Sequence, residues 1–328
     1  MNLPIRPRRN RQSPAIRGLV RESRLHPEQF IYPLFLSGND SNEEISSMPG
    51  CHRWSLAGLV AEAGAAFDEG IRTVVLFPRI SDSLKSPRAE EALNPNGLIP
   101  HAIRTLKHHL PELCVITDIA LDPYSSDGHD GLLSPDGRIL NDETIEILCG
   151  QALTHARAGA DFVSPSDMMD GRVGAIRAAL DSENFSSTGI LSYTAKYASA
   201  CYGPFRGALD SAPRSGDKKT YQMDPANRRE ALREAALDEA EGADILMVKP
   251  AGLYLDIISD LHAASSLPIA AYQVSGEYLM IRSAAAAGWL DETRMIMESL
   301  TAIHRAGASL ILTYFARTAA RLIKTHAS

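Results

Sequence analysis

The chain has 328 residues, 45% of them hydrophobic and 22% charged, which is typical of a globular protein and ordinary for a single α/β barrel. Its net charge of −7 argues against general nucleic-acid binding, and no apolar run approaches the roughly 18 residues of a membrane span. Four widely spaced cysteines without a CxxC pair argue against a disulfide framework or a structural zinc site, and indicate a reducing compartment.

Residues 1–25 are predicted to form an arm outside the main domain, because they hold seven arginines and are broken by three prolines. Such a segment is a solvated tail, a transit peptide, a nucleic-acid-binding arm or a surface that packs on another subunit. Apolar residues such as Ile16 and Leu19 favour packing on a partner subunit. We expect a cytoplasmic protein and leave a plastid open, since a transit peptide stays among the alternatives.

From residue 30 onward, short apolar runs alternate with alanine-rich helical segments. Eight strands are predicted, at Phe30–Leu36, Thr73–Phe77, Cys114–Ala120, Phe162–Ser164, Gly189–Tyr193, Ile245–Lys249, Pro268–Val274 and Leu310–Tyr314. Four helical segments end in a glycine just before an apolar run, which fits a left-handed residue past the helix end. Eight βα units, without a GxGxxG motif after the first strand, favour a (β/α)8 TIM barrel over an open sheet, here spanning residues 26–328.

The apolar run Ile245–Lys249 ends in a lysine at the point where chemistry gathers in such barrels, the carboxyl end of a strand. Burial lowers the pKa of an amine and leaves it neutral, so that it can attack a carbonyl carbon. Lys196 lies just past the end of the neighbouring predicted strand, and two ammonium groups close together disfavour each other's charge. The pair predicts a Schiff-base site with Lys249 as its nucleophile.

The end of the third strand and the loop after it are rich in aspartate, with Asp118, Asp122 and Asp130 among the acidic residues. Their oxygens suit magnesium or a monovalent cation better than zinc. Aspartate, glycine, serine and proline also form turns, so the spacing alone leaves a simple turn-rich loop open.

Residues from about 197 to 221 are predicted to form an active-site lid without regular structure, since they are rich in glycine, proline, serine and charge. Arg206 and Lys218 are candidates for clamping a substrate carboxylate, and solvated charges on a mobile loop are the alternative. Ser275 follows the seventh predicted strand and Tyr314 ends the eighth, at the usual anion-binding edge of such barrels. A tyrosine also often packs at the edge of a core with its hydroxyl satisfied, so these two residues alone leave a structural role open.

Five motifs together make the chain resemble one enzyme family over nearly its whole length. They are VSPSDMMDGR at 163–172, YTAKYAS at 193–199, YGPFR at 202–206, MVKP at 247–250 and VSGEY at 274–278. The family is porphobilinogen synthase, also called 5-aminolevulinate dehydratase. The resemblance implies a TIM barrel whose arm wraps a neighbouring subunit in a homo-octamer, with no nucleic acid or membrane as partner. It also implies a hydro-lyase that condenses two 5-aminolevulinate molecules into porphobilinogen, with loss of two waters, in tetrapyrrole biosynthesis.

The resemblance implies roles for individual residues. Lys249 is expected to form a Schiff base with the substrate in the P site, and Lys196 with the substrate in the A site. The expected carboxylate ligands are Arg206 and Lys218 for the A site, with Lys219 as an alternative to Lys218, and Ser275 and Tyr314 for the P site. A class I aldolase, which needs one lysine, and a nucleic-acid-binding protein that uses the arm are the rival interpretations.

Zinc-dependent members of the family place three cysteines where this chain has Ala120, Asp122 and Asp130. We therefore expect no catalytic zinc, but the aspartate-rich subtype that responds to Mg²⁺ and, in some members, to K⁺. Asp118, Asp122 and Asp130 are candidates for binding a cation or a substrate amino group. Glu234 matches the family's allosteric Mg²⁺ ligand; without the resemblance it is an ordinary charge on the polar face of a helix.

Overall fold

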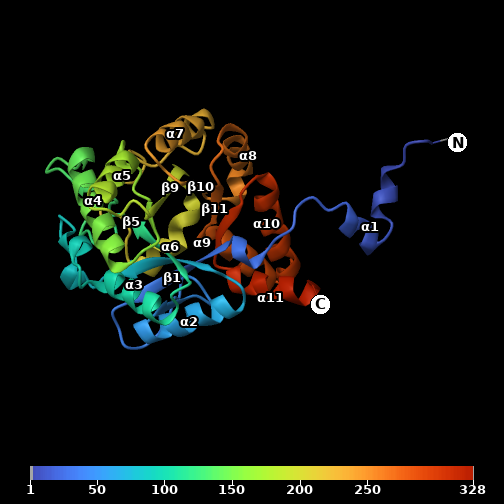
Figure 1. Ribbon diagram of the computed structural model, residues 1–328, viewed down its shortest axis with the longest axis horizontal. Coiled ribbons are helices and arrows are strands. Elements are labelled where there is room, and N and C mark those ends of the chain that lie inside the picture. The colour runs from blue at the N-terminus through green and yellow to red at the C-terminus, as the bar shows by residue number, and fades with distance from the viewer. Residues whose placement is uncertain (1–2, 328) are drawn as a thin grey trace.

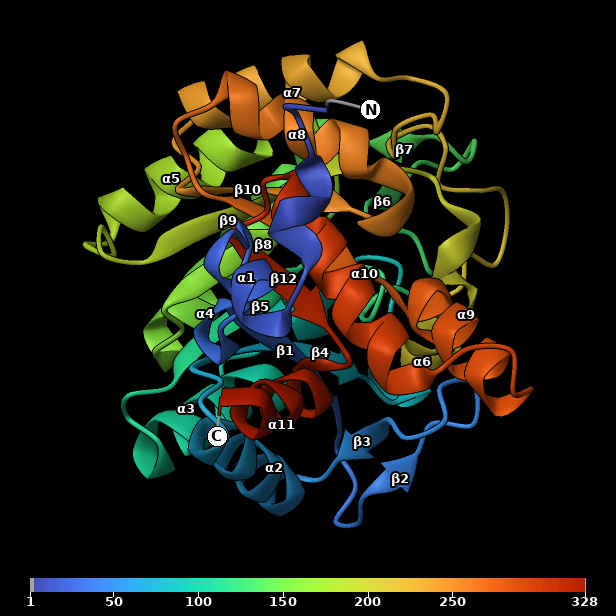
Figure 2. The same ribbon diagram turned by 90° about the vertical axis from the view of Figure 1, so that its right-hand side faces the viewer.

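The computed structural model describes residues 3–327 and contains a closed barrel of eight parallel strands. The strands are β1 (Phe30–Ser37), β4 (Thr73–Arg79), β5 (Cys114–Ile119), β8 (Phe162–Pro165), β9 (Gly189–Lys196), β10 (Ile245–Lys249), β11 (Ile269–Gln273) and β12 (Leu310–Thr313). Each strand pairs with the next, and β12 pairs with β1 to close the ring. The predicted strands and the TIM barrel are therefore confirmed, as Figure 1 and Figure 2 show.

Helices surround the barrel, since each crossover between parallel strands returns over its outer face. They are α2 (Leu56–Asp68), α3 (Leu98–His109), α4 (Asn141–Ala158), α5 (Arg172–Ser182), α7 (Arg229–Ala240), α8 (Leu255–Ala264), α9 (Ser275–Ala286), α10 (Glu292–Ala306) and α11 (Ala316–Ala327). Short strands lie outside the barrel at β2 (Glu43–Glu44), β3 (His52–Trp54), β6 (Leu132–Leu133) and β7 (Ile139–Leu140). The four glycines predicted to end helices all have positive φ, from +97° at Gly70 to +123° at Gly307. Figure 2 shows the helices arranged around the strands.

The barrel strands are buried up to the rim where they end. Along β10 the residues from Leu246 to Lys249 are all buried, and its neighbours β9 and β11 are buried as well. A strand buried on both faces favours a continuous apolar run, which explains why β10 could be recognised in the sequence. Because the strands are parallel, their carboxyl ends all meet at one rim.

The segment predicted as an irregular lid contains helical structure, so that part of the prediction is wrong. It holds a 3-10 turn at Ala200–Tyr202 and the short helix α6 (Gly203–Leu209). Pro204 stands at the first turn of α6, where its fixed φ suits a helix start, and Ala208 and Leu209 are buried. Residues 197–221, the predicted lid, therefore consist of a helix followed by a loop and are called the lid below. Strand β9 runs three residues beyond the predicted end at Tyr193, so Lys196 is its last residue rather than lying just past it.

The described part of the arm, residues 3–25, extends away from the barrel in Figure 1. It contains a 3-10 turn at Pro7–Arg11 and the helix α1 (Pro14–Leu19), and neither has a buried residue. Residues 1 and 2 of the predicted arm lie outside the described residues. Within residues 3–327 the structure contains no helix with the length and apolar character that a membrane span requires.

Candidate active site

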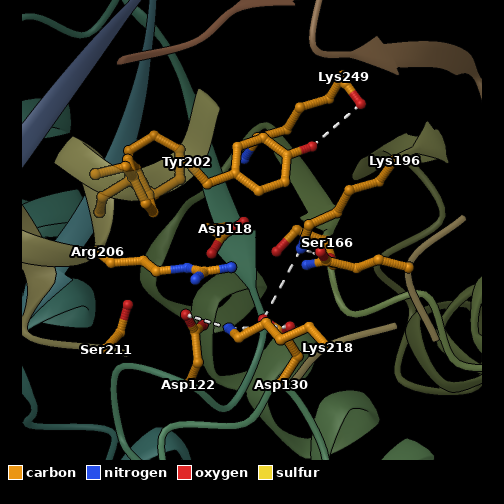
Figure 3. A pocket seen from close by; sticks show the side chains of 13 residues that line it. Asp118, Asp122, Asp130, Ser166, Lys196, Tyr202, Arg206, Ser211, Lys218 and Lys249 are labelled. Carbon is orange, nitrogen blue, oxygen red and sulfur yellow. Dashed lines mark hydrogen bonds and ion pairs between the residues drawn. The ribbon is translucent and has the colours of Figure 1, made fainter. Parts of the chain in front are cut away.

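A cavity opens at the carboxyl ends of the barrel strands, between the aspartate-rich loop and the lid (Figure 3). Its lining residues are Phe77, Asp118, Asp122, Asp130, Ser166, Lys196, Tyr202, Phe205, Arg206, Ser211, Lys218, Gln222 and Lys249. The two predicted lysines, the three aspartates and both lid cations thus share one cavity. They come from the ends of separate strands and from the lid, as expected for a TIM-barrel site.

Lys249 ends β10 inside a pocket of aromatic rings. Its Nζ lies 4.6 to 5.2 Å from the ring centroids of Tyr193, Tyr202, Phe205 and Tyr272. Only 6% of the residue is exposed, and no carboxylate within residues 3–327 forms an ion pair with it. Burial, with a smaller contribution from the Lys196 charge, lowers the pKa of Lys249 to about 7. A large fraction of this amine is therefore neutral near neutral pH.

Lys196 pairs in register with Lys249 across the β9–β10 ladder, so the two side chains leave the same row of the barrel. Its surroundings differ, because its Nζ donates to the backbone carbonyl of Ser166 and lies 3.9 Å from a carboxylate oxygen of Asp130. Tyr193 is near both amines, with its ring centroid 5.8 Å from the Nζ of Lys196. Hydrogen-bond acceptors thus orient this second amine toward the acidic side of the cavity.

The end of β5, with Asp118, and the aspartate-rich loop after it, with Asp122 and Asp130, supply buried carboxyl groups with unequal proton affinities. Burial, reinforced by Asp122, raises the pKa of Asp118 to about 7, and one Asp118 oxygen has no hydrogen-bond partner. Burial also raises the pKa of Asp122. Burial opposes ionisation of Asp130 as well, but Lys196 and Lys218 lower its pKa to about 2. Asp118 is thus the carboxyl group best suited to exchange a proton near neutral pH.

Lys218 belongs to the lid and is buried between two of these carboxylates. Its Nζ lies 3.2 Å from Asp122 and 3.2 Å from Asp130 (Figure 3). Burial alone would lower the pKa of Lys218, but the two carboxylates raise it. Lys219 points elsewhere: its side chain is 75% exposed and pairs with Asp217 at 3.8 Å. Of these two lysines, Lys218 is the one that lines the cavity.

The other predicted carboxylate ligands have different surroundings. Arg206 on α6 is half-buried and lines the cavity, and its side chain has no hydrogen bond or ion pair within residues 3–327. Ser275 Oγ accepts a hydrogen bond from the Phe205 amide at 3.0 Å and so anchors the lid. The Tyr314 hydroxyl lies 2.8 Å from that of Tyr272, in the wall next to Lys249. Ser275 and Tyr314 are thus behind the cavity lining rather than in it.

Glu234 lies on α7 and lines a separate cavity with Glu230 and Asp170. Burial raises the pKa of Glu234, and nearby carboxylates raise it further. The positive charge of Arg172 acts in the opposite direction and lowers this pKa. Mg²⁺ prefers oxygen ligands, keeps several waters and often uses one or two carboxylates, so Glu234 stays a candidate ligand for this ion. Within residues 3–327 no cluster of three or more His, Cys, Asp or Glu side chains is arranged to hold a metal.

Sequence reasoning missed the aromatic walls around Lys249 and two polar lining residues, Ser211 and Gln222. One signal for the walls was available, since Tyr193 and Tyr272 lie close to the ends of the two strands that flank β10. The lid residues gave no such signal, because their position depends on how α6 packs.

The fold and this cavity define a class of protein: a TIM-barrel enzyme with two buried lysines at the strand ends of its cavity. Residues 4–322 match the family described as delta-aminolevulinic acid dehydratase. The chain therefore belongs to the delta-aminolevulinic acid dehydratase family, which confirms the resemblance seen in its motifs and makes it a member of a hydro-lyase family.

Individual relatives agree with this assignment. The chloroplastic delta-aminolevulinic acid dehydratase of Physcomitrium patens is 61% identical over 320 residues, covering 97% of this chain and 74% of that protein. The chloroplastic enzyme of Glycine max is 60% identical over 325 residues, covering 98% and 79%. A crystal structure of the Toxoplasma gondii enzyme, in complex with its reaction product porphobilinogen, superposes with a TM-score of 0.96 at 52% identity, covering 98% of this chain and 92% of that one.

Proposed function

We propose that this chain condenses two molecules of 5-aminolevulinate into porphobilinogen, with loss of two waters, through imines on Lys249 and Lys196. One observation carries the proposal: two buried lysines are register partners on adjacent strands and open into one cavity. A single-lysine aldolase would need only one of them. Two amines suit a reaction that joins two identical keto-amines.

The first step belongs to Lys249. Its neutral amine adds to the ketone carbon of one substrate, and loss of water gives an imine, which is a better electrophile and electron sink than the ketone. The rings of Tyr202, Phe205 and Tyr272 around Nζ exclude water from this amine. The same desolvation keeps the amine neutral and hence nucleophilic.

The second substrate is held by Lys196 on the acidic side of the cavity. An imine on one substrate acidifies the neighbouring carbon, and an imine on the other activates the carbonyl carbon that this carbon attacks. Asp118, with a pKa near 7 and a free oxygen, is placed to accept or return a proton. Holding both substrates together contributes up to roughly 7–11 kcal/mol in favourable cases.

The carboxylate of the second substrate is assigned to Arg206 and Lys218. Arg206 supports this role because it has a guanidinium without a partner in the described chain. Lys218 is preferred over Lys219 because it is buried in the cavity. We assign the carboxylate of the first substrate to Ser275 and Tyr314, which lie next to the aromatic wall of Lys249.

The proposed cation dependence follows from the acidic residues. Asp122 and Asp130 already share the ammonium group of Lys218, so a K⁺ or Mg²⁺ ion near this loop would join an existing charge pair. Glu234 would hold an allosteric Mg²⁺, which would neutralise the carboxylates that raise its pKa. Because Ala120, Asp122 and Asp130 supply no thiolate, no catalytic zinc is proposed in this loop.

The arm, residues 1–25, is proposed to pack on a second copy of the chain within a homo-octamer, while residues 26–328 form the catalytic barrel. Its exposed apolar residues Leu3, Ile5 and Leu19 support this role. Deleting residues 1–11 should change the assembly size measured by light scattering. An intact octamer that has lost salt-sensitive RNA binding would instead support a nucleic-acid arm. We place the enzyme in the cytoplasm, with a plastid as the alternative that its chloroplastic relatives support.

The proposed reaction is tested directly by its stoichiometry. The purified chain is incubated with 5-aminolevulinate, and both substrate and porphobilinogen are quantified by liquid chromatography and mass spectrometry. Two substrate molecules should disappear for each porphobilinogen formed. If the chain consumed 5-aminolevulinate without forming porphobilinogen, this result would contradict the proposal and would favour a class I aldolase instead.

A further inference from the structure

We infer that Ser211 is a further substrate-binding residue, whose hydroxyl donates a hydrogen bond to the same substrate carboxylate that Arg206 binds. This inference rests on the proposed condensation and adds a third ligand to the second substrate's carboxylate. Ser211 follows α6 in the lid and lines the cavity together with Arg206 and Lys218.

The Ser211 side chain is buried without a partner. It is 1% exposed, and its Oγ has no hydrogen bond within the described chain. A buried hydroxyl without a partner costs free energy, and such groups are rare unless a ligand or water completes them. Its backbone amide donates to the Arg206 carbonyl at 3.3 Å, which ties Ser211 to the end of the helix that carries Arg206. In Figure 3 the hydroxyl lies on the same side of the cavity as Arg206 and Asp122.

The charges in the cavity indicate where a substrate carboxylate would bind, and therefore where a hydroxyl donor is useful. Lys218 is already compensated by Asp122 and Asp130, each 3.2 Å from its Nζ. Of the two lid cations that line the cavity, Arg206 is thus the one without a carboxylate partner in residues 3–327. A carboxylate presents two oxygens with several lone pairs, so a neutral hydroxyl beside the guanidinium completes its binding without adding charge.

The lid backbone around Ser211 is fixed by contacts on both sides. Before it, Lys85 Nζ donates to the carbonyl of Asp210 at 2.9 Å. After it, the Arg214 amide donates to the Asp127 carbonyl at 3.0 Å. Gly128 completes the contact: its φ is +71°, and a Cβ there would lie 2.2 Å from the Ala212 carbonyl oxygen. The hydroxyl is therefore held in place before substrate binds.

The test compares Ser211→Ala with the unmodified chain, with Ser211→Thr, which retains a hydroxyl, and with Ser215→Ala as a control. Ser215 is an exposed serine of the same lid loop that does not line the cavity. KM should rise roughly tenfold or more in Ser211→Ala, the size expected for one hydrogen bond to a charged group, with kcat unchanged. Ser211→Thr should recover most of this loss, and Ser215→Ala should match the unmodified chain.

Two further readouts separate substrate binding from a structural role. At a substrate concentration where borohydride traps adducts on both lysines of the unmodified chain, Ser211→Ala should keep the adduct on Lys249 and lose that on Lys196. Its thermal midpoint should stay equal or rise, because the variant removes a buried hydroxyl without a partner. An unchanged KM, equal loss of both adducts, or a raised KM with a lowered midpoint would overturn the inference. Absence of any adduct in the unmodified chain would refute the proposed condensation itself, independently of the variants.

Discussion

Lys249 and Lys196 occupy equivalent positions on neighbouring strands, yet the two sides of the cavity are chemically opposite. Aromatic rings surround the amine of Lys249, whereas a carbonyl of Ser166 and the carboxylate of Asp130 hold that of Lys196. The strand register therefore places the two amines next to each other. The side chains around each amine then determine its pKa and its orientation. An aromatic wall removes water and lowers the pKa of its amine; an acidic wall orients its amine and binds a charged partner.

The largest expected effect comes from breaking the aromatic side at its nucleophile. Lys249→Ala should lower kcat by roughly 10⁴-fold or more, because no other group in the cavity replaces the first imine. The measurement is porphobilinogen formation under saturating 5-aminolevulinate, with the circular dichroism spectrum as a folding control. Lys107→Ala offers a matched control, since that lysine is partly buried and paired with an aspartate, Asp161, but lies outside the cavity lining. Normal turnover by Lys249→Ala would contradict the account.

The next effect separates the carboxyl groups of the acidic side. Asp130→Asn should lower the free energy of unfolding by about 3 kcal/mol at pH 7, because it removes a buried partner of Lys196 and Lys218. Asp118→Asn should cost about 1 kcal/mol or less, because the pKa of Asp118 is raised to about 7 and the carboxyl group is already partly neutral. Urea unfolding of both variants measures the difference. Equal losses would show that the two carboxyl groups share one environment.

A pH series sharpens the comparison further. The pKa of Lys249 is lowered from 10.5 to about 7, so kcat/KM should rise about tenfold per pH unit up to pH 7 and then level off. The free energy of unfolding should also depend on pH. Between pH 7 and 10.5 Lys249 is protonated in the unfolded chain and neutral in the folded one, so its contribution to the free energy of unfolding rises with pH. Below pH 7 both states are protonated and this contribution is constant. Lys249→Met should lack the rise in stability, and a rise that persists in this variant would assign it to another group.

The smallest expected effect concerns metal ions. A zinc-selective chelator should leave activity unchanged, and Mg²⁺ should raise it by a few-fold through Glu234, in line with coupling free energies of about 1–3 kcal/mol between distant sites. Glu234→Gln should lose the Mg²⁺ response and retain basal turnover. Loss of activity with the chelator that only zinc restores would contradict the aspartate-loop argument.

The sequence predicted the barrel well, because buried parallel strands have a strong apolar signal and glycines mark the helix ends. The run Ile245–Lys249 matches β10 from end to end. It also indicated Lys249 and Lys196, since a lysine at the end of an apolar run is chemically conspicuous. Their substrate came from the family resemblance and not from residue patterns.

The rest of the site depends on tertiary packing. Nothing local to Lys218 reveals that it lies between Asp122 and Asp130, which are about ninety residues away along the chain. The position of Ser211 likewise cannot be predicted from its local sequence, because the contacts around it join the lid to two other loops. Short-range patterns therefore give the strands and their end residues, and the lid side of the cavity requires the structure.

The central claim is that Lys249 forms the first imine and that Lys196 forms the second. The most direct measurement is reduction with borohydride at rising 5-aminolevulinate concentration, followed by peptide mass mapping of the modified lysines. An adduct should appear on Lys249 at low substrate and on Lys196 only at higher substrate. An adduct on neither lysine, or one confined to Lys196, would contradict the account.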